Sequence, residues 1–248
     1  MGTATNDQNF KFLDQTLNLL LIEDNPEFKD FIGELFEPVT IYKLHTASTC
    51  AEALSLLRSG LRFHTCIMDL GMNDVENDEF FILRQYSNHC SIIVLTGSSS
   101  PNKGATCIKL GARAVLEKGA TFDSRALFNL VNDNVILNVI NHRYSENSPD
   151  TLNFATKILL ERKPQTVTEW ADYMRITDRQ LRNLWQTGAG FSAKYVLFVY
   201  DMLSCALDYY RVKLFGSAEE RENLDCSSEE KLFSYFTSHK EIITFLLS

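Results

Sequence analysis

The chain lacks the features that would tie a small fold together covalently or anchor it in a membrane. Its six cysteines include no C-x-x-C pair, and most of them stand inside apolar or helical stretches. No apolar run approaches the ~18 residues of a membrane span, and the polar N-terminus, Met1 to Lys11, lacks the basic-then-apolar layout of a signal peptide. We therefore expect reduced, buried thiols in a cytoplasmic protein, with no zinc site, no disulfide frame and no membrane contact.

The chain also lacks an excess of basic residues. Its 24 Lys and Arg stand against 32 Asp and Glu, which gives a formal net charge of −8. This balance excludes a uniformly basic nucleic-acid coat protein, so any contact with nucleic acid must come from a local patch. With 45% hydrophobic residues, the 248-residue chain has enough core material to exclude overall disorder. Its length suits one large domain or two ordinary ones.

The charge is unevenly spread along the chain. Residues 1–150 hold 12 basic and 19 acidic residues, whereas the remainder holds 12 and 13. Within that remainder, residues 157–194 hold seven basic and four acidic residues, a local excess of positive charge. The stretch 145–150 is polar and contains a helix-interrupting proline. We predict that it is a linker between two domains, at 14–144 and 151–248.

The first part alternates short apolar strands with helices. Leu17 to Ile22 is a nearly continuous apolar run, typical of a strand covered on both faces in a parallel sheet. Asn25 and Pro26 then provide an N-cap and a first helical residue. Further strands are predicted at 40–46, 65–70, 91–96 and 114–116, with helices at 50–58, 79–87, 103–110 and 124–142. Because crossovers between parallel strands are right-handed, this order predicts an α/β fold with a doubly wound, five-stranded parallel sheet.

Polar side chains end or follow four of the predicted strands. They are Glu23 and Asp24 after the first, Asp69 on the third, Thr96 on the fourth and Lys118 after the fifth. In doubly wound sheets the carboxyl ends of the strands meet in one crevice. Three converging carboxylates repel one another unless a divalent cation neutralises them, and a hard oxygen ligand set suits Mg²⁺. With the metal bound, Asp69 can act as a nucleophile toward a phosphoryl group, while Lys118 and the Thr96 hydroxyl bind phosphate oxygens.

Several fragments of the first part resemble the receiver domain of two-component response regulators. The resemblance covers about residues 14 to 142 and implies a flavodoxin-like fold. It rests on fragments in the family's order and approximate spacing: Ile22-Glu23-Asp24-Asn25, Ile67-Met68-Asp69-Leu70, Val94-Leu95-Thr96-Gly97, Gly111-Ala112 and Glu117-Lys118-Gly119. Each fragment alone is a weak signal, whereas five in register form a strong one.

The resemblance implies a signalling protein rather than an enzyme, in which a sensor histidine kinase phosphorylates Asp69. It also implies that Mg²⁺ is held by Asp24, Asp69 and the main-chain carbonyl of Gly71, and by Glu23 through water. Three positions before the lysine, where the family usually has an aromatic switch residue, this chain has Val115. We therefore expect intact phosphorylation chemistry with an unconventional conformational readout.

The second part is predicted to be helical. Apolar residues at helical spacing predict a helix over 151–162 and a second over 166–174. A tight turn follows, and Thr177 with Gln180 has the pattern of a capping box that opens a third helix. Two short helices joined by a tight turn describe a helix-turn-helix at about residues 166–187, whose second helix can enter a major groove. Its exposed face is predicted to contact DNA through Arg179, Arg182, Asn183 and Gln186.

This second part also resembles the AraC-type DNA-binding domain, over roughly residues 151 to 212. The stretch Thr187 to Leu197 is similar to that family's Gly-x-Ser-Pro connection into a long linking helix, here expected at about 193–212. Residues 213–248 are expected to hold either a degenerate second helix-turn-helix or a dimerisation element. If a single motif reads DNA, a homodimer would supply the second half-site.

Three classes of function remain open from the sequence. The preferred one is a transcription regulator controlled by aspartyl phosphorylation. The second is a phosphorylation-dependent interaction protein, because exposed Arg, Asn and Gln on a helix often form only a solvated surface. The third, an enzyme that hydrolyses small phosphorylated substrates, is disfavoured because no predicted strand precedes a loop long enough to enclose a substrate. Salt-dependent binding to DNA distinguishes the first class from the second.

Overall fold

The chain divides into two compact units. The computed structural model describes residues 17–72, 80–97, 101–141 and 150–222. The division falls between Val135 and Ile136, inside the helix α5 (Ser124–Asn141). The predicted linker lies outside the described residues except for Asp150, which begins the next helix. Most of the predicted C-terminal segment, from residue 223 onward, also lies outside them.

The first unit is built on a five-stranded parallel sheet in the order β2-β1-β3-β4-β5. This architecture confirms the predicted doubly wound fold. The strands are β1 (Leu17–Ile22), β2 (Tyr42–Ala47), β3 (Thr65–Asp69), β4 (Ser91–Thr96) and β5 (Ala114–Glu117). Strand order reverses beside β1, because β2 lies on one side of it and β3 on the other. The crevice expected at such a switch point therefore lies at the carboxyl ends of β1 and β3.

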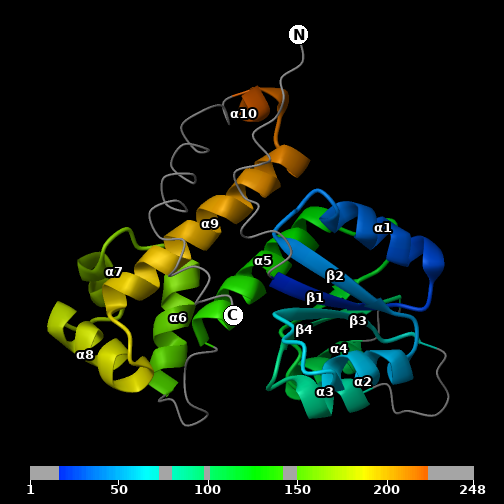
Figure 1. The fold of residues 1–248 in the computed structure, drawn as a ribbon, viewed down its shortest axis with the longest axis horizontal. Coiled ribbons are helices and arrows are strands. Elements are labelled where there is room, and N and C mark those ends of the chain that lie inside the picture. Colours follow the sequence, from blue (N-terminus) through cyan, green and yellow to red (C-terminus); the bar gives the residue numbers. More distant parts are fainter. Residues whose placement is uncertain (1–16, 73–79, 98–100, 142–149, 223–248) are drawn as a thin grey trace. The chain divides into compact units, whose positions relative to one another are not determined.

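Helices cover both faces of the sheet (Figure 1). The ribbon places α1 and α5 on one face, and α2, α3 and α4 on the other. The four helices not yet delimited are α1 (Pro26–Phe36), α2 (Cys50–Arg58), α3 (Phe81–Tyr86) and α4 (Pro101–Lys109). On the first face, Phe36 of α1 stacks on Phe128 of α5 with 5.9 Å between ring centroids. The Tyr42 hydroxyl donates to Asn132 Oδ1 at 2.7 Å, which ties β2 to α5.

Burial on both faces explains the nearly continuous apolar pattern of β1, which only Asn18 interrupts. Leu20 and Ile22 are fully buried on the face that packs against α2 and α3, while Leu19 and Leu21 are fully buried on the other. Burying such side chains contributes about 1.5–3 kcal/mol each. The carboxyl end of β1 is therefore held rigidly, and so are the residues that follow it. By contrast, Ala114, Val115 and Leu116 of the edge strand β5 are only half buried.

Some predicted boundaries are wrong by a few residues. The second strand begins at Tyr42 rather than 40, because the Tyr42 N–H closes a turn by donating to the Val39 carbonyl at 2.9 Å. The third strand ends at Asp69, and α4 begins at Pro101, two residues earlier than predicted. The long helix predicted over 193–212 continues to Phe215. These ends depend on local hydrogen bonds that hydrophobic periodicity does not specify.

The second unit is a set of helices that follows α5. Its elements are α6 (Asp150–Arg162), α7 (Val167–Tyr173), α8 (Asp178–Ala189), α9 (Ala193–Phe215) and α10 (Ala218–Glu222). The predicted capping box opens α8: the Thr177 N–H donates to Gln180 Oε1 at 2.8 Å, and the Gln180 N–H donates to Thr177 Oγ1 at 3.2 Å. In the part of the chain that the structure describes, no helix combines the length and apolarity needed to cross a bilayer.

Two tryptophans form the centre of this helical unit. Trp170 of α7 and Trp185 of α8 are fully buried, with ring centroids 5.3 Å apart. The Trp170 indole N–H donates to the Ala155 carbonyl of α6 at 3.1 Å, so it joins α7 to α6. Gly188 allows close packing of α8 on α6, because a Cβ there would lie 2.5 Å from Leu152 Cδ1. The three helices α6, α7 and α8 are therefore packed as one body.

The turn between α7 and α8 is a left-handed helix cap. Arg175 has φ of 57°, and its N–H donates to the Asp172 carbonyl at 3.0 Å. The Ile176 N–H donates to the Ala171 carbonyl, also at 3.0 Å, which completes a Schellman motif. Such a position favours glycine, and an L residue there is strained by about 1–2 kcal/mol. The sharp turn is thus maintained by hydrogen bonds and packing rather than by its residue type.

Replacing Arg175 with Gly is expected to raise the free energy of unfolding of the helical unit by about 0.5–1 kcal/mol, since the αL strain exceeds the extra backbone entropy of glycine. Urea denaturation followed by fluorescence of the two tryptophans measures the change. Arg182→Gly is the matched control: it makes the same substitution inside α8 and should destabilise the unit by about 1 kcal/mol. An equal decrease in the free energy of unfolding in both variants would contradict the assignment of strain to Arg175.

Candidate functional site

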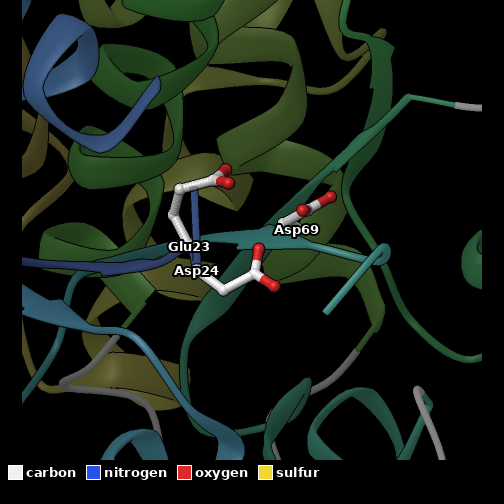
Figure 2. A group of neighbouring side chains, drawn as sticks. All are labelled: Glu23, Asp24 and Asp69. Carbon is white, nitrogen blue, oxygen red and sulfur yellow. The ribbon is translucent and has the colours of Figure 1, made fainter. Parts of the chain in front are cut away.

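Three carboxylates meet at the carboxyl ends of β1 and β3 (Figure 2). Glu23 and Asp24 directly follow β1, and Asp69 is the last residue of β3. Because these strands are neighbours in the sheet, their ends deliver the three side chains to one place. One carboxylate oxygen from each residue lies within 4.8 Å of the others. The structure thus brings together the acidic residues whose convergence the sequence predicts.

Short hydrogen bonds orient two of these carboxylates. The Gly71 N–H donates to Asp69 Oδ1 at 3.0 Å, so the chain folds back over the carboxylate immediately after β3. The Asn25 N–H donates to Glu23 Oε1 at 3.1 Å. Glu23 is fully buried and Asp69 is 9% exposed, whereas Asp24 is half buried. The cluster therefore has a buried side and a side that solvent can reach.

Lys118 is the positive charge of the site. Its ammonium Nζ lies 2.5 Å from Glu23 Oε2 and 2.9 Å from Asp69 Oδ2. Its main-chain N–H donates to the Thr96 carbonyl at 2.7 Å, which holds the residue beside the end of β4. Both oxygens of Asp69 are thus engaged, one by Lys118 and the other by Gly71. The Asp69 carboxylate is fixed in one orientation.

The charges of the site do not balance by themselves. At their formal charges, the three carboxylates and the one ammonium sum to −2 in a largely buried place. Burial raises the pKa of the Glu23 carboxyl above its ordinary value of 4.5, and the nearby Asp69 charge raises it further. The hydrogen bond and charge of Lys118 oppose this shift. A divalent cation would neutralise the remaining charge.

The donor set fits Mg²⁺ by its chemistry. All ligand atoms offered by Glu23, Asp24 and Asp69 are carboxylate oxygens, which hard cations prefer, and no sulfur or imidazole ligand belongs to the cluster. Gly71, predicted to add a main-chain carbonyl, lies in the turn that contacts Asp69. A Cβ at Gly71 would make only an ordinary contact with Asp69 Oδ2, at 3.4 Å, so the turn does not require glycine for space. Metal binding remains part of the proposal below.

Thr96 and Val115 lie on the neighbouring strands β4 and β5. Thr96 is the last residue of β4 and is buried, with 8% of its surface exposed. Val115 pairs with Val94 across β4 and β5, and its half-buried side chain packs against the core under α4. A Cβ on Gly104 of α4 would lie 3.9 Å from Val115 Cγ1. The predicted switch position is therefore a small aliphatic contact between β5 and α4.

The four predicted DNA contacts share one helix of the second unit. Arg179, Arg182, Asn183 and Gln186 are all exposed on α8, opposite the buried Leu181 and Trp185. Arg182 forms an exposed pair with Asp178 at 3.7 Å, which contributes little to stability. The Gln186 amide donates to the Gly190 carbonyl at 3.4 Å. Arg179 and Asn183 extend this polar surface.

One residue that contacts the acidic site was not predicted from the sequence. The ring centroid of Phe28, on the first turn of α1, lies 4.5 Å from the Lys118 ammonium. The ring also contacts Phe31 and Phe122, with centroids 5.8 and 5.4 Å away. Since 90 residues separate Phe28 from Lys118, no local pattern indicates the contact. An aromatic residue near a helix start is read from sequence as ordinary core.

Comparison with known proteins identifies the first unit at the family level. Residues 19–132 match the model of the response regulator receiver domain. The match ends before α6 and so does not extend into the second unit. No curated protein matches the chain.

Three solved structures illustrate the likeness. The signal receiver domain of a DNA-binding response regulator from Colwellia psychrerythraea is 25% identical, with 46% of this chain and 98% of that chain covered and a TM-score of 0.40. A response regulator receiver domain protein from Clostridium thermocellum is 24% identical, with 48% and 94% covered and a TM-score of 0.43. A response regulator from Burkholderia pseudomallei, solved with a phosphorylated aspartic acid, a calcium ion and citrate, is 22% identical, with 66% and 96% covered and a TM-score of 0.39.

Replacing Glu23 with Gln is expected to stabilise the metal-free protein at neutral pH and to flatten its stability profile above pH 4.5. Because the folded-state pKa of Glu23 is raised, the folded protein holds the proton more tightly than the unfolded chain, and wild type loses stability as pH rises through this window. Thermal unfolding of both proteins across this pH range, with a chelator present, measures the effect.

Glu27→Gln is the control for this prediction, because it removes one exposed carboxylate near the site without touching the cluster. If the thermal stabilities of wild type and Glu23→Gln changed with pH in parallel, the buried Glu23 charge would not oppose folding.

Proposed function

We propose that this chain, whose residues 19–132 are a response regulator receiver domain, is a DNA-binding response regulator of a two-component system. In this proposal a sensor histidine kinase phosphorylates Asp69 in a Mg²⁺-dependent reaction, and phosphorylation alters sequence-specific DNA binding by the helical unit. The observation that carries the proposal is the convergence of Glu23, Asp24 and Asp69 within 4.8 Å, with Lys118 held against Asp69. Packing alone does not account for this arrangement, because the desolvation of buried charges costs free energy even when the charges are paired.

The geometry supports Asp69 as the phosphoacceptor. Its carboxylate is oriented by Lys118 and by the Gly71 N–H, and it is the carboxylate of the cluster that both groups contact. An Asp69 oxygen would attack phosphorus, form a new P–O bond and release the donor group with the electrons of the broken bond. Lys118 would then bind a phosphoryl oxygen, and the Thr96 hydroxyl would donate to another.

Mg²⁺ would take part in the same phosphorylation of Asp69. Glu23, Asp24, Asp69 and the Gly71 carbonyl would hold it, and it would neutralise the charge of the carboxylates and the incoming phosphoryl group. The net charge of −2 among the described side chains of the cluster supports a divalent ion. The carboxylates alone would repel a phosphodonor.

DNA binding by the second unit is supported by the surface of α8. Exposed Arg, Asn and Gln side chains follow a tight turn and a capping box, and the supporting Trp170–Trp185 contact makes the helix rigid. Arg suits guanine edges and phosphates, and Asn or Gln suits adenine. Because one such helix contacts few base pairs, we propose that a homodimer binds two half-sites. We also propose that this helical unit is an AraC-type DNA-binding domain.

A second candidate is a phosphorylation-dependent protein-interaction module. It is favoured by two large side chains that the helical unit leaves exposed, Phe154 at 50% and Tyr173 at 41%. Such residues are common at protein interfaces. Under this alternative the helical unit would bind a protein partner and would not bind DNA.

Asp69→Asn is expected to abolish phosphorylation, because an amide oxygen is a much weaker nucleophile and forms no acyl phosphate under these conditions. Incubation with acetyl phosphate and Mg²⁺ should add one phosphoryl group to wild type, as measured by intact-protein mass spectrometry. Chelation of Mg²⁺ should prevent the addition. Glu117→Gln, at the exposed end of β5, is the control and should be labelled as wild type is. Labelling of Asp69→Asn at the wild-type rate would exclude Asp69 as the acceptor.

Replacing Arg179 and Arg182 together with Ala is expected to weaken binding to a selected DNA site by tenfold or more, since each good base contact contributes about 1–3 kcal/mol. The site comes from a random-sequence selection on the phosphorylated protein, and affinity is measured by fluorescence anisotropy over a range of salt concentrations.

Lys157→Ala with Arg162→Ala is the matched control for the DNA experiment, because it removes the same charge from α6 of the same unit. If the two double variants lose affinity equally for selected and unrelated DNA, α8 is not the recognition helix. If wild type shows no salt-dependent binding at all, the protein-interaction alternative replaces DNA binding.

A further inference from the structure

The Lys118 ammonium is held on three sides, and one of them is an aromatic ring. Glu23 and Asp69 supply two oxygen contacts, at 2.5 and 2.9 Å. The third is the ring of Phe28, 4.5 Å away and within the distance at which a cation is attracted to an aromatic face. Only 15% of the Lys118 side chain remains exposed, so water competes weakly with these contacts.

The Phe28 ring is itself fixed in place. The Phe28 N–H donates to Asn25 Oδ1 at 3.0 Å, which anchors the residue at the N-cap of α1. Phe122, in the turn between β5 and α5, meets the ring edge-on at 75°. Phe31, one turn further along α1, contacts both other rings. The three phenylalanines therefore form an aromatic cluster, with the ring of Phe28 placed against the ammonium.

A ring contact differs from a third carboxylate because the ring has no formal charge. Glu23 and Asp69 carry formal charges, so they attract the ammonium more strongly than the ring does. When Asp69 becomes an acyl phosphate, the ammonium must leave the carboxylate oxygen and follow the phosphoryl oxygens. Attraction to a ring face does not depend on the direction of any one N–H bond, so it can hold the ammonium over the ring while its oxygen partner changes.

We propose that Phe28 is a positioning residue for Lys118, which keeps the ammonium beside Asp69 during phosphoryl transfer. This inference rests on the proposed role of Asp69. In the reaction, an Asp69 oxygen bonds to the phosphorus of the donor and the donor P–O bond breaks. With acetyl phosphate, acetate leaves with the electron pair of that bond. Lys118 stabilises the negative charge on the transferring oxygens.

The test compares three single variants with wild type. Phe28→Leu keeps an apolar side chain but removes the ring over Lys118, and Phe28→Tyr keeps a ring there. Phe31→Leu removes the neighbouring ring of the same cluster. The initial rate of phosphorylation is measured by intact mass over a range of acetyl phosphate and Mg²⁺ concentrations. Thermal unfolding is recorded for each variant.

Phe28→Leu is expected to lower the maximal rate about three- to tenfold, a range that follows from the energy of a partly desolvated cation–aromatic contact. The Mg²⁺ concentration for half-maximal rate should stay within about twofold of wild type, because Phe28 contributes no metal ligand. Phe28→Tyr should recover most of the lost rate, and Phe31→Leu should react as wild type does.

Three results would overturn the inference while leaving the proposed function intact. They are a wild-type rate for Phe28→Leu, an equal loss in Phe31→Leu, and a failure of Phe28→Tyr to restore the rate when it unfolds at the wild-type temperature. Absence of labelling in wild type itself is a different outcome. It would remove Asp69 as acceptor, and the positioning role of Phe28 with it.

Discussion

The ion pair between Lys118 and Asp69 is the interaction on which the acidic site depends. It joins the turn after β5 to the end of β3, and the same ammonium reaches Glu23 after β1. Without it, three carboxylates would share a largely buried place with no positive charge. The parallel sheet provides the framework, because neighbouring strands of one direction end at one edge. Strands β1 and β3, which are buried apart from the half-buried Asn18, then hold the carboxylates in place.

The edge strand β5 is less buried than the central strands of the sheet. β5 is half buried, and Val115 makes a small aliphatic contact with α4 where an aromatic switch residue is usual in the family that the motifs resemble. A conformational signal from the acidic site to α4 would therefore pass through a valine side chain, which is smaller than the usual aromatic residue. Phe28 adds a contact to Lys118 from α1.

The second unit presents α8 through a buried aromatic contact and a strained turn. Trp170 and Trp185 fix α8 against α7, while Arg175 accepts a left-handed conformation so that the chain can reverse. The polar side chains of α8 are exposed because the opposite face is fully used in packing. The capping box at Thr177 was predictable from residue types alone, since a Thr followed by Gln in the third position satisfies free N–H groups locally. The αL conformation of Arg175 was not, because residue type argues against it.

The sequence by itself determined the elements that depend on local chemistry and apolar periodicity. It predicted the five parallel strands, the caps at Asn25 and Thr177, and the arrival of Glu23, Asp24 and Asp69 at one edge, and the match to the receiver domain family confirms the coarse fold. Only the tertiary structure decided which atoms meet: Lys118 with both Glu23 and Asp69, and Phe28 with Lys118. The physical reason is that such contacts join residues about fifty to ninety-five positions apart. Their partners are chosen by how strands and helices pack, which no local pattern records.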